Sequence, residues 1–183
     1  EEKSESSPEE QAKKKERTVH DLIEKSAAAA YKGDTVMALE RAKEAGKKEK
    51  QLCKFRESHG LSEGINLDLT YSVCFNLASM FHLNKMYGEA LNTYQLIVKN
   101  KQYPQAGRLR VNMGNIYYEQ KKYANAIKMY RMAMDQIPNT SKEIRFKIRR
   151  NIGICSLRQG NFADAIDNFE TVLENAKPED TGF

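Results

Sequence analysis

Apolar residues recur every three to four positions along nearly the whole chain, and no segment shows the strict alternation of apolar and polar residues expected of a strand. The first pattern is typical of amphipathic helices, which bury one apolar stripe and expose the opposite face. Glycine, proline and polar clusters interrupt the pattern and predict the helix ends. The sequence therefore predicts an all-α chain. Its expected helices are 18–31, 34–58, 69–83, 87–100, 105–120, 123–136, 141–159 and 162–176.

Three segments share one pattern of small and aromatic residues. A small residue on the first helix is followed 12 positions later by alanine on the second, and an aromatic residue follows four positions after that alanine. Small residues let two helices approach closely, because side-chain bulk sets the distance between their axes. One such pair cannot cover its own apolar face, so we expect the pairs to stack. The three sets are Ala78, Ala90 and Tyr94, then Gly114, Ala126 and Tyr130, then Gly153, Ala165 and Phe169.

This pattern resembles the tetratricopeptide repeat family, whose consensus places glycine, tyrosine, alanine, an aromatic residue, alanine and proline at set offsets. The flanking segments depart from it, because Ser156 replaces the first-helix tyrosine and Ile97 and Val172 replace the later alanine. The resemblance covers Leu69 to Pro178 and implies a tetratricopeptide-type α-solenoid of stacked antiparallel helix hairpins. The middle segment matches fully, with Gly114, Tyr117, Ala126, Tyr130, Ala133 and Pro138.

The chain divides into parts of different character. Residues 1–17 have nearly balanced charges and no apolar residue larger than Ala12, which predicts a disordered or partly helical tail. Over residues 18–68 the sequence predicts an atypical helical pair with a long charged second helix and a loop. Because the chain begins at Glu1 rather than methionine, we expect a fragment of a longer protein. Three tetratricopeptide repeats are expected at 69–104, 105–140 and 141–178, and a tail at 179–183.

Several helix ends have candidate caps in the sequence. Thr18 with Asp21 and Thr140 with Glu143 have the spacing of N-terminal caps, in which a side chain accepts a hydrogen bond from the first turn. Gly60 suits the C-terminal end of the second helix, because glycine adopts the left-handed backbone conformation found there.

Composition narrows the range of possible partners and compartments. The chain has 30 Lys and Arg against 25 Asp and Glu, a formal net charge of +5, which permits acidic partners but does not by itself indicate nucleic acid. Cys53, Cys74 and Cys155 are far apart and odd in number, which favours reduced thiols in a cytosolic compartment. No apolar run is long enough to predict a membrane-spanning helix.

The sequence lacks the motifs of common catalytic and metal sites. It has no glycine-rich phosphate loop, no nucleophile elbow and no paired carboxylates beside a histidine. Its three histidines form no ligand cluster with cysteine or carboxylate side chains, so structural zinc is not expected. We therefore expect a non-enzymatic protein without a catalytic site, cofactor or metal.

Residues outside the repeat consensus indicate a more specific family. The chain is similar to the polaris family, the large tetratricopeptide subunits of intraflagellar transport complex B, in GRLRVNMGNIYYEQKKYANAIKMYRMAMDQIP, KIRRNIGI and LDLTYSVCFNLA. The resemblance implies a protein–protein interaction scaffold for transport and assembly of cilia and flagella. It implies other complex B subunits or peptide segments as partners, and a location in the cytoplasm, cilium or flagellum and basal body. Nucleic acid, a small-molecule substrate and membrane insertion are not expected.

In the family that the chain resembles, one stripe of each first helix lines a concave groove. Asparagine stands at the same place of this stripe in all three repeats, and its amide can donate and accept toward an extended backbone. Alternatively, these asparagines satisfy neighbouring helices. The candidate partner-binding residues of the groove are Asn76, Ser79, Arg108, Asn112, Asn115, Lys147, Arg150, Asn151 and Arg158.

The first helix of the third repeat is markedly basic, which favours contact with an acidic partner segment over a solvated charged face. Two other functions stay open. An adaptor for another multiprotein complex, of chaperone or cell-cycle type, is one; the chaperone type needs lysine and asparagine where Phe75 and Ser79 stand. A helical-repeat RNA-binding module is the other, and salt-sensitive association is the most we expect of it. Its basic ridge would consist of Lys47, Lys48, Lys50, Lys54 and Arg56.

Overall fold

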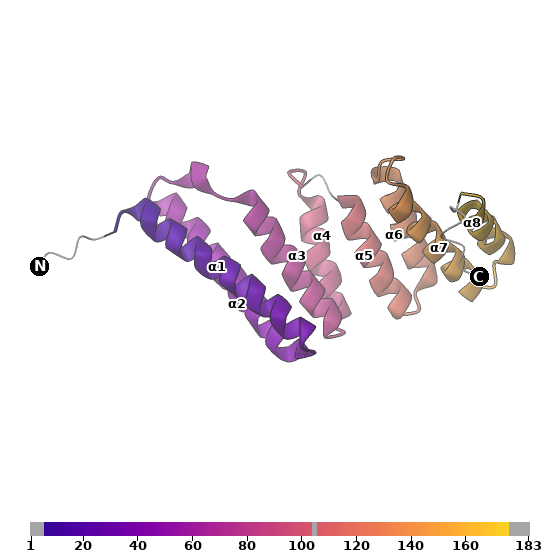
Figure 1. The fold of residues 1–183 in the computed structure, drawn as a ribbon, viewed down its shortest axis with the longest axis horizontal. Coiled ribbons are helices and arrows are strands. Elements are labelled where there is room, and N and C mark those ends of the chain that lie inside the picture. The colour runs from indigo at the N-terminus through magenta and orange to yellow at the C-terminus, as the bar shows by residue number, and fades with distance from the viewer. Residues whose placement is uncertain (1–5, 104–105, 176–183) are drawn as a thin grey trace, which may run out of the picture. The chain divides into compact units, whose positions relative to one another are not determined.

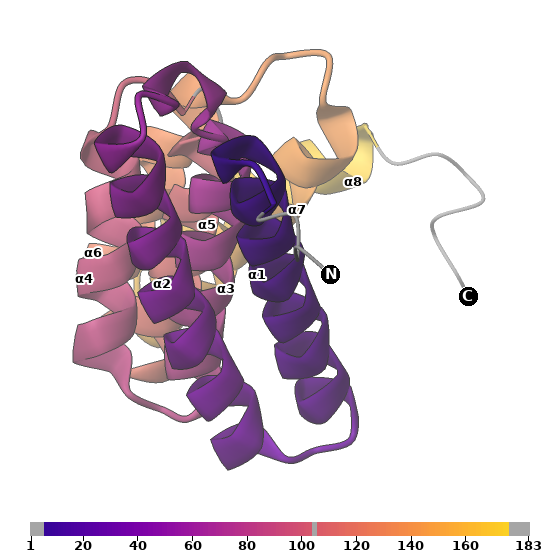
Figure 2. The ribbon, with the colours of Figure 1, turned by 90° about the vertical axis from the view of Figure 1, so that its left-hand side faces the viewer.

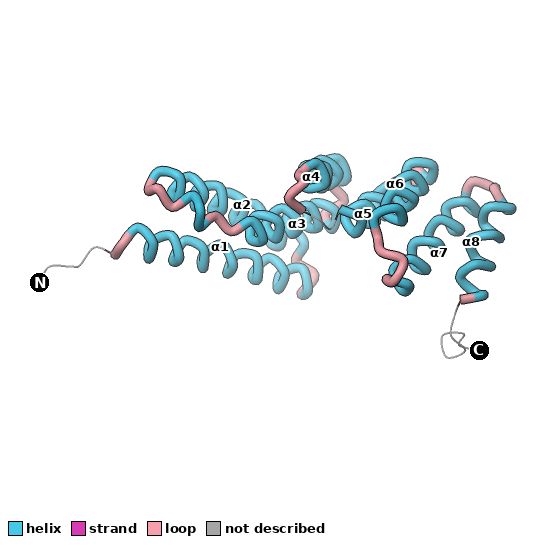
Figure 3. The backbone as a smooth tube through the Cα atoms, turned by 90° about the horizontal axis from the view of Figure 1, so that it is seen from above, coloured by secondary structure: helices cyan, strands magenta, loops and turns pink. Residues whose placement is uncertain are grey.

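The computed structural model describes residues 6–103 and 106–175, and this part of the chain contains helices and no strand. The expected all-α fold is therefore confirmed, and Figure 3 shows helices joined by short loops. Two compact units, Glu1–Lys99 and Asn100–Phe183, divide the chain. The helices of the first unit are α1 (Pro8–Tyr31), α2 (Thr35–Ser58), the short 3-10 helix η1 (Ser62–Gly64), α3 (Leu67–Leu83) and α4 (Tyr87–Lys99) (Figure 1). Those of the second unit are α5 (Ala106–Glu119), α6 (Tyr123–Gln136), α7 (Lys142–Arg158) and α8 (Phe162–Glu174).

Helix α1 begins at Pro8, well before the expected start at residue 18, and the capping role expected for Thr18 is wrong. The Ser7 hydroxyl accepts a hydrogen bond from the Glu10 backbone N–H at 3.2 Å, and the Glu10 carboxylate accepts one from the Ser7 N–H at 3.1 Å. This reciprocal pair satisfies two donors of the first turn. Ala12 is fully buried against the hydrophobic cluster of this unit, so a small side chain is enough to hold the first turns in place.

Two other helix ends test the cap predictions. The expected cap at Thr140 is wrong, because α7 is preceded by Ser141 and no side chain accepts a hydrogen bond there. Gly60 comes directly after His59, the residue that caps the C-terminal end of α2, and has φ +69°, so its expected role at this helix end is confirmed. The domain boundaries predicted from the sequence stay a prediction, and the outermost residues of both expected tails, 1–5 and 179–183, lie outside the described residues.

In the first unit α1 and α2 run side by side in opposite directions (Figure 2), and small residues line their contact. Ala38, Ala42 and Ala45 of α2 are buried. Opposite them, the buried Ser26 hydroxyl of α1 donates a hydrogen bond to the Ala38 carbonyl oxygen at 2.7 Å. Close helix contact and a buried hydrogen bond therefore hold the interface between α1 and α2. The hairpin that these two helices form then packs on α3.

In each helix hairpin of the second unit, the glycine of the first helix makes room for the aromatic ring of the second helix. A Cβ atom at Gly114 would lie 2.6 Å from Cε1 of Tyr130, and one at Gly153 would lie 2.7 Å from Cε1 of Phe169. Both distances are far inside van der Waals contact. The predicted close packing at these small residues is confirmed, and the partner that requires it is the aromatic ring.

Helix α7 packs on α6 in this unit. Ile127 and Tyr130 of α6 join Ile148, Ile152 and Cys155 of α7 in one buried cluster, with Tyr123 and Met134 packed against it. Stacking of one hairpin on the next therefore buries the face that a single hairpin leaves open.

Candidate functional site

The two predicted groove residues of the first unit take part in packing. The Asn76 amide donates a hydrogen bond to the Ser26 hydroxyl at 3.0 Å, linking α3 to α1. The Ser79 hydroxyl shares a hydrogen bond with the Tyr94 hydroxyl at 3.2 Å, linking α3 to α4. Both side chains are half-buried. These contacts support the alternative interpretation, in which the asparagine satisfies a neighbouring helix.

The second unit repeats this use of asparagine. The Tyr130 hydroxyl donates a hydrogen bond of 2.6 Å to the side-chain amide oxygen Oδ1 of Asn115, and the Asn151 side chain also hydrogen-bonds Tyr130. Burial raises the pKa of the Tyr130 phenol, and the hydrogen bond with Asn151 opposes that rise. The phenol therefore stays protonated at neutral pH and holds the two asparagines between α5, α6 and α7.

The charged members of the predicted groove have a different environment from the asparagines. Arg108, Lys147, Arg150 and Arg158 are exposed, while Asn112 is half-buried. Lys147, Arg150 and Arg158 recur at a spacing that places them on one face of α7; we call these three residues the α7 basic face. Arg108 lies on α5, apart from this face.

Two contacts limit the charge that α7 offers to a partner. The Lys147 ammonium lies 2.7 Å from a carboxylate oxygen of Glu143, and this contact lowers the pKa of the Glu143 carboxyl group. The Arg145 guanidinium donates hydrogen bonds of 2.8 Å each to the carbonyl oxygens of Met134 and Ile137. These carbonyls lie at the end of α6, where helix geometry leaves them without a partner, so Arg145 caps α6.

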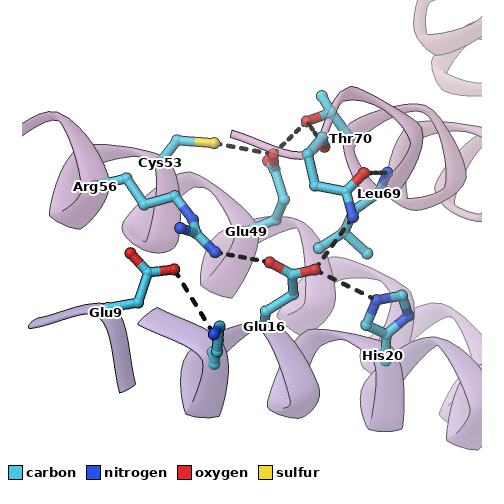
Figure 4. A network of polar contacts seen from close by, with 10 residues as sticks. Glu9, Glu16, His20, Glu49, Cys53, Arg56, Leu69 and Thr70 are labelled. Carbon is cyan, nitrogen blue, oxygen red and sulfur yellow. Dashed lines mark hydrogen bonds and ion pairs between the residues drawn. The ribbon is translucent and has the colours of Figure 1, made fainter. Parts of the chain in front are cut away.

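Sequence reasoning missed a network of polar residues joining α1, α2 and α3 (Figure 4). The Arg56 guanidinium, 4% exposed, donates to the Glu16 carboxylate at 2.9 Å. The other carboxylate oxygen of Glu16 accepts a hydrogen bond of 3.1 Å from the Asn66 amide, 50 positions away in the chain. Arg56 is thus not part of an exposed basic ridge, which corrects that expectation.

The second half of the network centres on Glu49, whose side chain is also buried. One Glu49 carboxylate oxygen accepts hydrogen bonds from the Thr70 hydroxyl at 2.7 Å and from the Cys53 thiol at 3.1 Å. Glu49 and Thr70 belong to α2 and α3, so the network anchors α3 to the first hairpin. No local pattern signals it, because its members come from three separate segments.

The cysteines have the properties of structural residues. Burial, with the hydrogen bond and charge of Glu49, raises the pKa of Cys53 to about 12. Burial alone raises the pKa of Cys155 to about 11. A thiol acts as a nucleophile or metal ligand through its thiolate form, which both residues lack at neutral pH. Among the described residues, no group of three or more histidine, cysteine or acidic side chains could hold a metal ion, and no helix could cross a bilayer.

The last helix of the second unit exposes a row of apolar side chains. Phe162, Ile166 and Leu173 of α8 are 62%, 55% and 65% exposed. They stand at the repeat positions that Tyr123, Ile127 and Met134 hold in α6, where α7 covers them. The same repeat face is therefore buried in α6 and open in α8.

Known proteins with the same repeat pattern match this chain. Residues 105–177 match the family model of the tetratricopeptide repeat. The chain is 50% identical over 181 residues to the human intraflagellar transport protein 88 homolog, a match that covers 99% of this chain and 22% of that protein. The chain thus spans about a fifth of the length of the curated relative that it matches.

Solved structures with a similar fold have much lower sequence identity. BtubC from P. vanneervenii is 16% identical, with a TM-score of 0.54 and coverage of 95% of both chains. A MamA protein is 16% identical, with a TM-score of 0.50 and coverage of 86% of this chain and 91% of that one. At this identity the likeness shows the helical fold alone.

Proposed function

We propose that this chain is a scaffold segment of intraflagellar transport complex B. The premise is that the chain is a tetratricopeptide repeat protein and resembles the large tetratricopeptide repeat subunit of that complex. The observation that carries the proposal is the 50% identity over 99% of the chain. It extends through α1 and α2, outside the residues that the repeat family model matches. A generic repeat pattern would not produce identity there.

The scaffold binds other complex B subunits or peptide segments of them, and acts in the cytoplasm, at the basal body and in the cilium or flagellum. It does so without catalysis, cofactor or metal. Two features support a non-catalytic role: the thiols of Cys53 and Cys155 are held protonated, and the buried carboxylate of Glu49 is engaged by Thr70 and Cys53.

Within the nine predicted groove residues, we assign the partner contact to the exposed cations. The α7 basic face offers three of them along one helix, with only Lys147 paired to a carboxylate among the described residues. Such a row fits an acidic segment of a partner subunit, because charge complementarity steers association and selects the partner. Asn115 and Asn151 then contribute through Tyr130, by fixing α5 and α7 against α6.

Charge reversal on α7 tests this function. The double variant Lys147→Glu/Arg150→Glu should lose co-purification with complex B subunits from ciliated cells, while its helical circular dichroism and thermal unfolding stay close to wild type. Lys128→Glu/Arg131→Glu is the matched control, because these exposed residues of α6 have the same spacing and the same change in charge. Recovery of every subunit by the α7 variant would refute the assignment. Failure of the wild-type chain to recover any subunit would refute the proposed function.

A further inference from the structure

A basic hollow lies between α1 and α2 in the first unit, with a volume of about 370 Å³. Gln11, Lys14, Lys15 and Thr18 recur at the spacing that places them on one face of α1. Lys48 and Gln51 contribute the α2 side, because the two helices are antiparallel and α1 runs past the second half of α2. Ser6 completes the lining, and we call these seven residues the α1–α2 hollow.

Among the residues that the structure describes, three ammonium groups and no carboxylate line this hollow. Lys14 and Lys48 form no ion pair with the residues that the structure describes, whereas Lys13 and Lys25 on the same helix pair with Glu9 and Asp21. The third ammonium, of Lys15, lies 5.2 Å from the centre of the Phe55 ring, a cation–π contact that leaves its charge in place.

The acidic side chains of the neighbouring turns are engaged elsewhere. The Glu10 carboxylate accepts its hydrogen bond from the Ser7 backbone N–H. The Glu44 carboxylate lies 3.0 Å from the Arg41 guanidinium. These two carboxylates are therefore engaged away from the lysines of the hollow.

The neutral side chains of the hollow indicate the kind of ligand. The Gln11 amide nitrogen already donates to the Ser6 carbonyl at 2.8 Å, which leaves its carbonyl oxygen available as an acceptor. The amide of Gln51 offers both a donor and an acceptor, and Thr18 adds a hydroxyl group. Such groups match the alternating N–H and C=O of an extended peptide, while the ammonium groups match its acidic side chains.

We propose that the α1–α2 hollow is a docking site for an acidic, extended peptide segment of a partner protein. Nucleic acid fits it less well, because base recognition in single strands relies on open aromatic faces. The described lining of the hollow contains no aromatic residue, and the Phe55 ring that Lys15 contacts is stacked on the His59 ring, with 4.1 Å between the ring centres. The site lies in the first unit and is separate from the α7 basic face, so it adds a second partner contact to the scaffold.

Binding of a fluorescein-labelled ten-residue peptide of alternating Glu and Gly, followed by fluorescence anisotropy at two salt concentrations, tests the proposal. Lys14→Glu/Lys48→Glu should weaken binding by about tenfold or more, a loss of about 1.4 kcal/mol. The matched control is Lys32→Glu/Lys50→Glu, which has the same net charge but alters exposed lysines that do not line the hollow. It should retain most of the wild-type affinity.

Three results would overturn the proposal. One is the absence of peptide binding by the wild-type chain. Another is an equal loss of affinity in both double variants, which would show attraction by net charge alone. The third is tighter binding of a uridine decanucleotide than of the peptide, with the same loss in Lys14→Glu/Lys48→Glu, which would assign the hollow to RNA. Lys147→Glu/Arg150→Glu should bind the peptide as wild type does, so failure here and failure of the proposed complex B role are distinguishable.

Discussion

Gly114 leaves very little room beside the Tyr130 ring for one added methyl group. In Gly114→Ala the new Cβ would lie 2.6, 2.8 and 3.0 Å from Cε1, Cδ1 and Cζ of the Tyr130 ring. An ordinary carbon–carbon contact is about 3.5–4.0 Å, so the ring or the helix must move by about 1 Å. Tyr130 is 2% exposed and its hydroxyl is bonded to Asn115, so the ring has little room to move.

The magnitude follows from two opposing effects. Overpacking a close-packed core costs about 1–3 kcal/mol, and three clashing ring atoms place this site near the upper end. Replacing glycine by alanine inside a helix recovers about 1 kcal/mol. Gly114→Ala should therefore lower the free energy of unfolding by about 2 kcal/mol.

A matched substitution separates packing from helix propensity. Gly46 lies inside α2, and the nearest atom to an added Cβ is Val73 Cγ1 at 3.8 Å, an ordinary contact. Gly46→Ala should therefore raise the free energy of unfolding by up to about 1 kcal/mol. Urea denaturation followed by circular dichroism measures both variants. The reasoning is refuted if Gly114→Ala is as stable as wild type, or if both variants shift in the same direction.

A double-mutant cycle tests the pairing itself. Tyr130→Leu removes the ring that blocks the Cβ, at the cost of its own lost packing and hydrogen bond. Gly114→Ala should then be much less harmful in the Tyr130→Leu background than in the wild type, with a coupling energy of about 1 kcal/mol or more. Additive effects would show that the two residues do not share the predicted clash.

Two further predictions concern the stability of the second unit. Ile127→Ala should lower the free energy of unfolding by about 2–4 kcal/mol, because α7 covers Ile127. Ile166→Ala, at the equivalent exposed position of α8, should change it by less than about 1 kcal/mol. Equal losses of unfolding free energy in urea denaturation would contradict this difference in burial. The Cys155 thiol has an ordinary pKa of 9.0, raised by burial to about 11, so the unfolded chain loses this proton at lower pH than the folded one. Stability from Cys155 is therefore complete below pH 9 and declines as pH rises toward 11, and Cys155→Ala should show a shallower decline of unfolding free energy over this range.

Much of the fold could be predicted from the sequence, because periodicity and propensity are properties of contiguous residues. The spacing of apolar residues located the helices of the second unit to within a few residues at each end. The glycine–aromatic pattern identified the crossings at Gly114 and Gly153 before their partners were known. The start of α1 was missed because it depends on the burial of Ala12 among residues of α2 and α3.

The candidate sites depended far more on tertiary structure. The sequence supplied the charged residues, but only the packed hairpins decided which of them face solvent. Arg56, which the sequence placed in a basic ridge, is buried beside Glu16, and Arg145 of the basic helix α7 caps α6. Lys14 and Lys48 line the same hollow because α1 and α2 lie side by side and antiparallel. Local sequence determined the helices and their apolar stripes. The roles of the polar side chains were decided by contacts between distant segments, because burial and hydrogen bonding depend on which helices lie together.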